Sequence, residues 1–202
     1  MKKLIYSLIT ISFIFTSCSK EQGCMDSIAT NYNVDAEEDD NSCTYGLTGG
    51  AWIANSATEE GTISVTMAGI PFFDSTWTYT ETNPDSLEPY KLKFNDDATW
   101  MEYDISNIPM EGGTWSQSGN DLTLTDSDTS MVLNIISVSQ EQSTIELSIS
   151  AVENDGGMIM SYNVTSTLNF NRDLNSCCED NTAQRIGKNQ WFDKKKFKNL
   201  LK

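Results

Sequence analysis

The sequence predicts an all-β fold: an antiparallel up-and-down barrel, preceded by a small cysteine-bearing segment and followed by a helical C-terminal tail. Three observations support this. Residues 47–173 consist of short runs of β-branched and aromatic residues, which are typical of strands. Clusters of Gly, Asn and Asp separate the runs, and these residues accept the positive φ of tight turns. No segment of this range shows helical periodicity.

Ten strands are expected in this range. Residues 122–125 and 145–150 alternate apolar and polar side chains, so each of these strands has one apolar face. Short strands joined by hairpin turns favour an antiparallel meander, and closure into a barrel removes its exposed edges. The expected strands are Ala51–Ser56, Thr62–Met67, Ser75–Thr80, Tyr90–Phe94, Thr99–Tyr103, Gly113–Gln117, Asp121–Thr125, Met131–Ser137, Thr144–Ser150 and Ile159–Phe170.

The charge of the chain argues against a nucleic acid partner. The chain has 29 acidic and 13 basic residues, a net charge of −16. Residues 47–175 hold 19 acidic and three basic residues, whereas binding to phosphates requires Lys and Arg. The chain also lacks histidine, which removes the usual general base near neutral pH and the commonest metal ligand.

The N-terminus predicts export. Two lysines precede an apolar run from Leu4 to Phe15, which has the order of a secretory signal peptide and is short for a membrane span. The run ends in Phe15-Thr16-Ser17-Cys18, which resembles a lipobox, the site where a bacterial lipoprotein is cut and diacylated, with Phe15 where Leu is usual. The resemblance implies a signal peptide over residues 1–17 and a lipid anchor on Cys18. The alternative is an ordinary signal peptide in which Cys18 is incidental.

Lipidation would place the protein in the cell envelope of a Gram-negative-type bacterium. The lipid on Cys18 would hold it to the outer membrane, with the inner membrane as the alternative.

Four further cysteines, Cys24, Cys43, Cys177 and Cys178, allow three pairings, and export permits disulfides. Residues 23–43 resemble a short repeat of secreted bacterial proteins, GC-x-D-x-x-A-x-N-Y-N-x-x-A-x-x-D-D-G-S-C, with Asn41 in place of the usual Gly. In that repeat the two cysteines pair. The resemblance therefore implies a Cys24–Cys43 disulfide that staples a small N-terminal module within residues 18–46.

Acidic and amide side chains alternate along this module. Asp35, Glu37, Asp39 and Asn41 occupy every second position, an arrangement that can place several oxygens around one Ca²⁺ ion. The alternative is a solvated acidic spacer that holds the barrel away from the membrane. No other cofactor is expected.

Three segments resemble bacterial lipocalin-like domains, in the same order along the chain. Residues 50–52 match the Gly-x-Trp of the first strand, residues 94–100 are similar to the hairpin F-x-x-D-G-x-W/F, and residues 113–124 are similar to G-x-W-x-x-x-G-N-x-L-x-L. The resemblance implies a lipocalin-like barrel over residues 47–175. It also implies that Arg172, after the last strand, packs on the indole of Trp52 beside Gly50, a structural cation–π contact at the barrel floor.

Residues 176–202 form a separate, basic tail. Seven basic residues and one acidic residue lie between Asn181 and Lys202, and Ile186, Phe197, Leu200 and Leu201 fall loosely on one helical face. Three arrangements are open: a helix packed on the acidic barrel, a helix on an anionic membrane surface, and a flexible extension.

A lipocalin-like barrel can hold one small ligand at its mouth. We therefore expect a monomeric, membrane-anchored binding protein that holds or presents a small hydrophobic ligand. The alternative is a structural or interaction lipoprotein with a solid barrel and no ligand, since fold alone does not establish function. The aromatic and soft residues expected near the cavity are Trp77, Tyr79, Trp100, Tyr103 and Met110.

An enzymatic function is not expected. Glu102 and Asp104 are two carboxylates of the kind that glycosidases use. They alternate with apolar residues, however, as solvent-facing positions do, and no histidine is present to act as a base.

Overall fold

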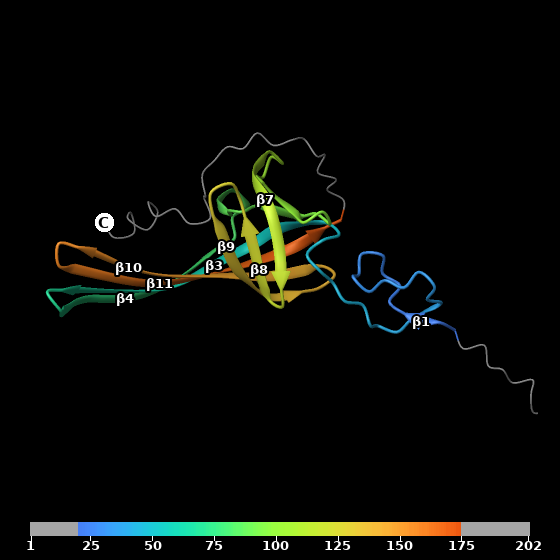
Figure 1. Ribbon diagram of the computed structural model, residues 1–202, viewed down its shortest axis with the longest axis horizontal. Helices are drawn as coiled ribbons and strands as arrows, with labels where there is room; N and C mark the ends of the chain where they lie inside the picture. Colours follow the sequence, from blue (N-terminus) through green and yellow to red (C-terminus); the bar gives the residue numbers. More distant parts are fainter. Residues whose placement is uncertain (1–19, 175–202) are drawn as a thin grey trace, which may run out of the picture. The chain divides into compact units, whose positions relative to one another are not determined.

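The computed structural model describes residues 20–174 (Figure 1). Two compact units meet in sequence at Thr44 and Tyr45. The predicted signal peptide, Cys18, Cys177, Cys178 and the basic tail lie outside the described residues. No helix within the described range has both the length and the apolar character needed to cross a membrane.

The N-terminal unit is held by one disulfide and a few side-chain hydrogen bonds. Strand β1 (Gln22–Gly23) pairs in parallel with β2 (Glu38–Asp39). The structure confirms the Cys24–Cys43 disulfide, with a Cα–Cα distance of 4.8 Å. The Asn31 amide ties the middle of the unit to its C-terminal end, because it donates to the Ser42 carbonyl at 2.7 Å and accepts from the Thr44 N–H at 2.8 Å.

The second unit is an antiparallel β-barrel, as predicted. Eight of its strands close into a ring, because β3 pairs with β5 on one side and with β11 on the other. β4 pairs with β3 outside this ring, and a 3-10 turn at Pro84–Ser86 leads from β4 to β5. The strands are β3 (Ala51–Met67), β4 (Ile70–Glu81), β5 (Lys91–Phe94), β6 (Thr99–Tyr103), β7 (Pro109–Ser118), β8 (Asp121–Thr125), β9 (Ser130–Val138), β10 (Gln142–Asp155) and β11 (Met158–Asp173).

One expected break in the sheet is absent. The sequence predicts two strands, Ala51–Ser56 and Thr62–Met67, but β3 runs through both. The polar stretch between them stays extended because β11 pairs with it along its whole length and β4 pairs with it from Ala57 onward. Threonine and glutamate are tolerated there because one face of the strand is solvated.

The interior of the closed barrel is packed with large apolar side chains. The core includes Trp100, Leu124 and Leu168, and Leu147 continues it along β10. Close packing of this kind leaves few voids larger than a water molecule. Eight side chains of the core are less than 2% exposed: Trp52, Phe94, Phe170, Leu47, Leu92, Leu122, Leu133 and Ile145.

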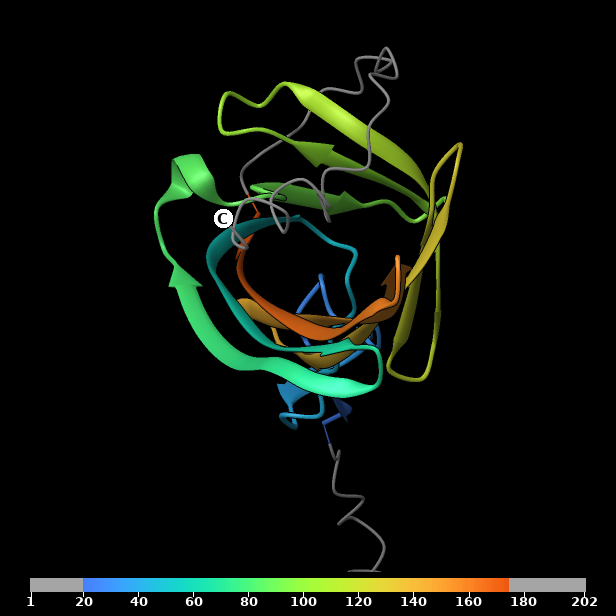
Figure 2. The same cartoon turned by 90° about the vertical axis from the view of Figure 1, so that its left-hand side faces the viewer.

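Two hairpins extend beyond the barrel as a four-stranded sheet, which we call the arm. The arm comprises residues 57–67 of β3, all of β4, residues 147–155 of β10 and residues 158–166 of β11. Figure 1 shows the four strands leaving the barrel together, and Figure 2 shows the strong curvature of their ribbons. β3 begins at the barrel floor near Trp52, so the arm projects from the opposite end, the mouth.

Candidate ligand site

The barrel floor is closed by Trp52 and Arg172. The Arg172 guanidinium carbon lies 4.2 Å from the centroid of the Trp52 ring, and Trp52 is completely buried. The guanidinium also donates to the carbonyls of Thr48 at 2.5 Å and Gly46 at 2.8 Å. Gly50 has a φ of 148°, and a Cβ there would lie 3.1 Å from the Arg172 side chain. This end of the barrel is therefore a structural cap with no room for a ligand.

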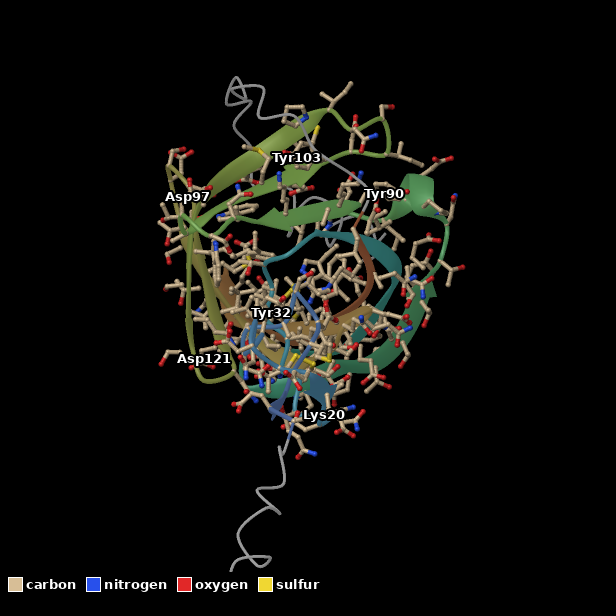
Figure 3. All side chains as sticks on the ribbon, turned by 90° about the vertical axis from the view of Figure 1, so that its right-hand side faces the viewer. Lys20, Tyr32, Tyr90, Asp97, Tyr103 and Asp121 are labelled. Carbon is tan, nitrogen blue, oxygen red and sulfur yellow. A yellow bond between two sulfur atoms is a disulfide. The ribbon has the colours of Figure 1, made fainter. Side chains whose placement is uncertain are left out.

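The four aromatic residues predicted near a cavity lie in three different places. Trp100 is 3% exposed and belongs to the barrel core. Tyr103, labelled in Figure 3, pairs with Lys91 of β5 and lies on the face of β6 opposite to Trp100. Trp77 and Tyr79 lie on β4, and their register with Gly61 and Glu59 of β3 puts both side chains on one face of the arm. The structure thus brings together only Trp77 and Tyr79.

That face of the arm, its inner face, continues the inner wall of the barrel. Residues paired across neighbouring strands share a face, and the register places the inner-face residues in line with Leu147 and Leu168, which belong to the barrel core. Ile149, on the same face, also packs against that core. The other apolar residues of the inner face are Ile63, Val65, Met67, Phe73, Trp77, Tyr79, Ala151, Met158, Met160, Tyr162 and Val164.

The outer face of the arm is polar by comparison. Hydroxyl and amide side chains pair across its strands: Thr58 with Thr80 at 3.1 Å, and Ser150 with Asn163 at 2.6 Å. Such cross-strand hydrogen bonds are typical of a solvated sheet surface. The contrast between the two faces marks the inner face as the apolar surface of this unit.

The inner face is most buried at its centre and more exposed toward its rim. Ile63, Val65, Tyr162 and Val164 are each exposed by 9% or less, whereas Tyr79 is 55% exposed. The Trp77 ring lies flat over Gly61, where a Cβ would be only 2.0 Å from the ring. The absence of a side chain at Gly61 therefore creates the space that the Trp77 indole fills.

Three carboxyl groups lie on the wall opposite the arm at the barrel mouth. Glu102 shares the inward face of β6 with Trp100 and is only 8% exposed. Glu111 is near the start of β7, and Asp126 follows β8. Burial raises the pKa of Glu111 to about 7, helped by its hydrogen bond to Asp126 and by the charges of Asp126 and Glu102. Near neutral pH, Glu111 is therefore about half protonated, and its protonated form donates to Asp126.

Asp126 has the opposite environment. Burial opposes its ionisation, but the backbone N–H groups of Asp128 and Thr129 donate to its Oδ1 at 2.6 and 2.7 Å. These bonds outweigh burial, so the pKa of Asp126 is lowered. When the pair holds one proton, that proton therefore lies on Glu111 and Asp126 is ionised.

The expectation that Glu102 faces solvent is wrong. Glu102 lies on the inward face of β6, because it pairs with Leu92, which lies on the core face of β5. Asp104 lies beyond β6 in a turn, where its Oδ1 accepts from the N–H groups of Ser106 and Ile108 at 2.9 and 2.8 Å. The two carboxylates therefore belong to different environments and do not form a pair.

The candidate calcium ligands lie in the N-terminal unit and are engaged in turns. The Asp39 carboxylate accepts from the Asn41 N–H at 3.0 Å, and Asn41 has a φ of 59°. The Asp35 N–H donates to the Asn33 side chain at 3.0 Å, and Glu37 is exposed in the same loop. Among residues 20–174, no group of three or more metal-ligating Cys, Asp or Glu side chains comes together.

A shallow open depression of about 560 Å³ lies away from the arm. It is lined by Asp96, Ala98, Trp115, Ser116, Gln117 and Gly119, from turns and strand ends near the barrel floor. None of the predicted ligand residues contributes to it. The inner face of the arm, rather than this depression, is the better candidate site.

A closed, antiparallel eight-strand barrel with a capped floor and an apolar wall at its mouth defines the class of small β-barrel proteins. The chain belongs to the lipocalin-like domain family, whose model matches residues 47–147. No curated protein and no solved structure matches the chain significantly.

Sequence reasoning missed most of the inner face of the arm. The period-two alternation of Ile63 with Val65 and of Tyr162 with Val164 was available as a signal. It indicates an apolar face but not that the face lies beyond the closed barrel. The sequence gives no signal for the contact between Glu111 and Asp126, because this contact depends on the register of two paired strands.

Proposed function

We propose that this protein is a membrane-anchored lipocalin-like binding protein that holds or presents a small hydrophobic ligand in the cell envelope. The inner face of the arm carries the proposal, since it is an apolar surface at the barrel mouth that includes Trp77 on β4. Ligand sites are typically concave and apolar with a few polar groups. Glu102 and Glu111 would be those polar groups.

Anchoring rests on the sequence. Cys18 follows an apolar signal-like run, and acyl chains on this residue would tether the mature protein, with the acidic N-terminal module as a spacer. Cys18→Ser should release the protein from the envelope membrane fraction into the periplasmic fraction. Retention of the Cys18→Ser variant in the membrane fraction would contradict the anchor.

Ligand binding can be tested by native and denaturing mass spectrometry of the chain from Ser19 onward, purified from an oxidising periplasm. A reproducible extra mass that is lost on denaturation would show a bound ligand. A bare mass that stays unchanged after incubation with a membrane lipid extract would contradict the proposal.

A matched pair of variants locates the site. Met158 and Ile159 are neighbours on β11 with 37% and 38% exposure, but their register puts them on opposite faces of the arm. Met158→Lys on the inner face should weaken binding of the lipid, and Ile159→Lys on the outer face should leave it unchanged. Equal effects of the two variants would place the ligand elsewhere.

A structural or interaction lipoprotein is the second candidate, and one observation favours it. The closed part of the barrel is filled by side chains such as Trp52, Phe94 and Phe170, each less than 2% exposed. A ligand would therefore have to bind at the mouth and arm. A bare mass in the experiment above would leave this second function as the better account.

A further inference from the structure

We propose that the basic C-terminal segment, residues 184–202, docks on the inner face of the arm and covers the candidate ligand site. The docking itself is inferred from the surface described below. The further consequence, that the docked segment competes with a ligand, rests on the proposed function.

The rim of the inner face is left exposed. A sheet with one apolar face is stable when that face packs against another element. Beyond the closed barrel, no other labelled strand faces the arm (Figure 1). Several apolar side chains at the rim are substantially exposed, among them Met67 at 45%, Phe73 at 47% and Tyr79 at 55%.

The charges of the arm identify the chemistry of the cover. The four arm segments contain six acidic residues and no basic residue. Glu59, Glu81 and Glu153 lie on the inner face by register. An apolar surface bordered by carboxylates fits a segment that is both apolar and basic.

Residues 184–202 have this composition. They contain seven basic residues and one acidic residue, together with six large apolar residues: Ile186, Trp191, Phe192, Phe197, Leu200 and Leu201. Residues 20–175 offer no second stretch of this kind, because they hold only four basic residues.

The chain is long enough for the segment to reach the arm. Tyr162, at the centre of the inner face, lies 11 residues before the end of β11 at Asp173, or about 36 Å at the rise of a strand. The 13 residues from Leu174 to Ile186 span up to about 40 Å when extended. The basic segment can therefore begin at the centre of the inner face.

Zero-length carbodiimide cross-linking of the chain from Ser19 onward tests the docking. This reaction joins a lysine amine to a carboxylate in direct contact. Glu59 and Glu60 are adjacent, exposed residues on opposite faces of β3. We expect intramolecular cross-links from the tail lysines, such as Lys195 and Lys196, to the inner face. Glu59→Gln should lose the cross-links formed at residue 59, and Glu60→Gln should retain them.

A second pair of variants tests the apolar contact. Tyr79→Lys with Met158→Lys on the inner face should abolish the cross-links, and Thr78→Lys with Ile159→Lys on the outer face should preserve them. Cross-links to Glu60 in the Glu59→Gln variant that are as frequent as those to Glu59 in the Glu60→Gln variant would overturn the proposal. Cross-links found only between ¹⁴N- and ¹⁵N-labelled copies would also overturn it, and would indicate a second copy as the partner.

The competition with a ligand has a separate readout. Replacing Trp191, Phe192 and Phe197 with serine should remove the inner-face cross-links and increase lipid binding in the native mass spectra. Loss of the cross-links with no lipid bound in any variant would uphold docking and contradict the ligand function. Lipid binding that is unchanged by the tail variant would contradict the covering role.

Discussion

At the scale of single residues, Arg172 joins three parts of the barrel floor. Its guanidinium lies over Trp52, donates to the carbonyls of Gly46 and Thr48, and reaches the Ser139 carbonyl at 3.2 Å. The segment before β3, the loop before β10 and the end of β11 are therefore held by one side chain. A lysine has one amine instead of a planar fork and cannot make all of these bonds.

Arg172→Ala should lower the free energy of unfolding by about 2–3 kcal/mol, because it removes the cation–π contact and leaves buried carbonyls without a donor. Urea unfolding followed by tryptophan fluorescence measures the change. Arg172→Lys should recover part of the loss. An alanine variant as stable as the parent chain would show that water replaces the guanidinium without cost.

Glu111 makes stability depend on pH. Its folded pKa is raised from the usual 4.5 to about 7, mainly by burial. The folded chain therefore keeps a proton that the unfolded chain releases, so this contribution to stability is complete below pH 4.5 and is lost as the pH rises through about 7.

Glu111→Gln keeps a hydrogen-bond donor toward Asp126 and cannot ionise. The variant should match the parent chain at pH 4 and exceed its stability at pH 8 by about 1 kcal/mol, a value reduced for solvent screening. Urea titrations at the two pH values measure this difference. Glu60→Gln, at an exposed position of β3, is the control and should show no such divergence.

At the scale of elements, the hairpin between β5 and β6 contains a strained residue. Ala98 has a φ of 63°, the left-handed region that costs a residue with a Cβ about 1–2 kcal/mol. The turn is otherwise well satisfied, since the Asp97 carboxylate accepts from the Thr99 N–H at 3.0 Å and from its hydroxyl at 2.6 Å. These bonds also lower the pKa of Asp97.

Ala98→Gly should therefore raise the melting temperature, by an amount that corresponds to about 1 kcal/mol. Differential scanning calorimetry measures it. Ala54→Gly, within β3 and buried, serves as the opposite control and should destabilise the barrel. A decrease in stability for Ala98→Gly would mean that the alanine methyl group contributes more packing than the strain costs.

The elements also show where sequence patterns succeed and fail. The alternation in residues 122–125 and 145–150 correctly predicted β8 and the first half of β10, because one face of each strand is buried in the core. The polar stretch from Ser56 to Gly61 suggested a break in β3. Pairing on both sides of a strand overrides local composition, and a single sequence does not contain that pairing.

The same limit applies to the candidate site. The aromatic character of Trp77, Tyr79, Trp100 and Tyr103 was visible in the sequence, but their distribution over core, arm and opposite strand faces depends on register. Glu102 shows the limit most clearly. Glu102 does alternate with its neighbours along the strand, as predicted, but the alternation places it on the buried face of β6 and not on the solvent-exposed face.

At the scale of the whole molecule, the chain consists of two units with different sources of stability. The barrel unit has a large apolar core. In the N-terminal unit, Cys24 and Ala29 are the buried hydrophobic residues within residues 20–44. The disulfide therefore supplies the stability that a core would otherwise supply, about 3 kcal/mol of unfolding free energy for a loop of this length.

Replacing Cys24 and Cys43 with serine should unfold residues 20–44 and leave the barrel intact. Hydrogen exchange should show loss of protection in those residues alone. All five tryptophans follow Tyr45 in the sequence, so the fluorescence-detected melting of the variant should match that of the parent chain. A lowered barrel transition would show that the two units stabilise each other.

The arm also has a consequence for self-association. Within residues 20–174, β4 ends the sheet on one side, and β10 beyond Glu146 pairs only with β11. Open strand edges are templates for pairing with another chain, and natural proteins guard them with charge. The six carboxylates of the arm repel a second arm at neutral pH. Replacing these carboxylates with neutral residues would leave the same edges free to join, so the charge of the arm keeps two molecules from associating through their edge strands.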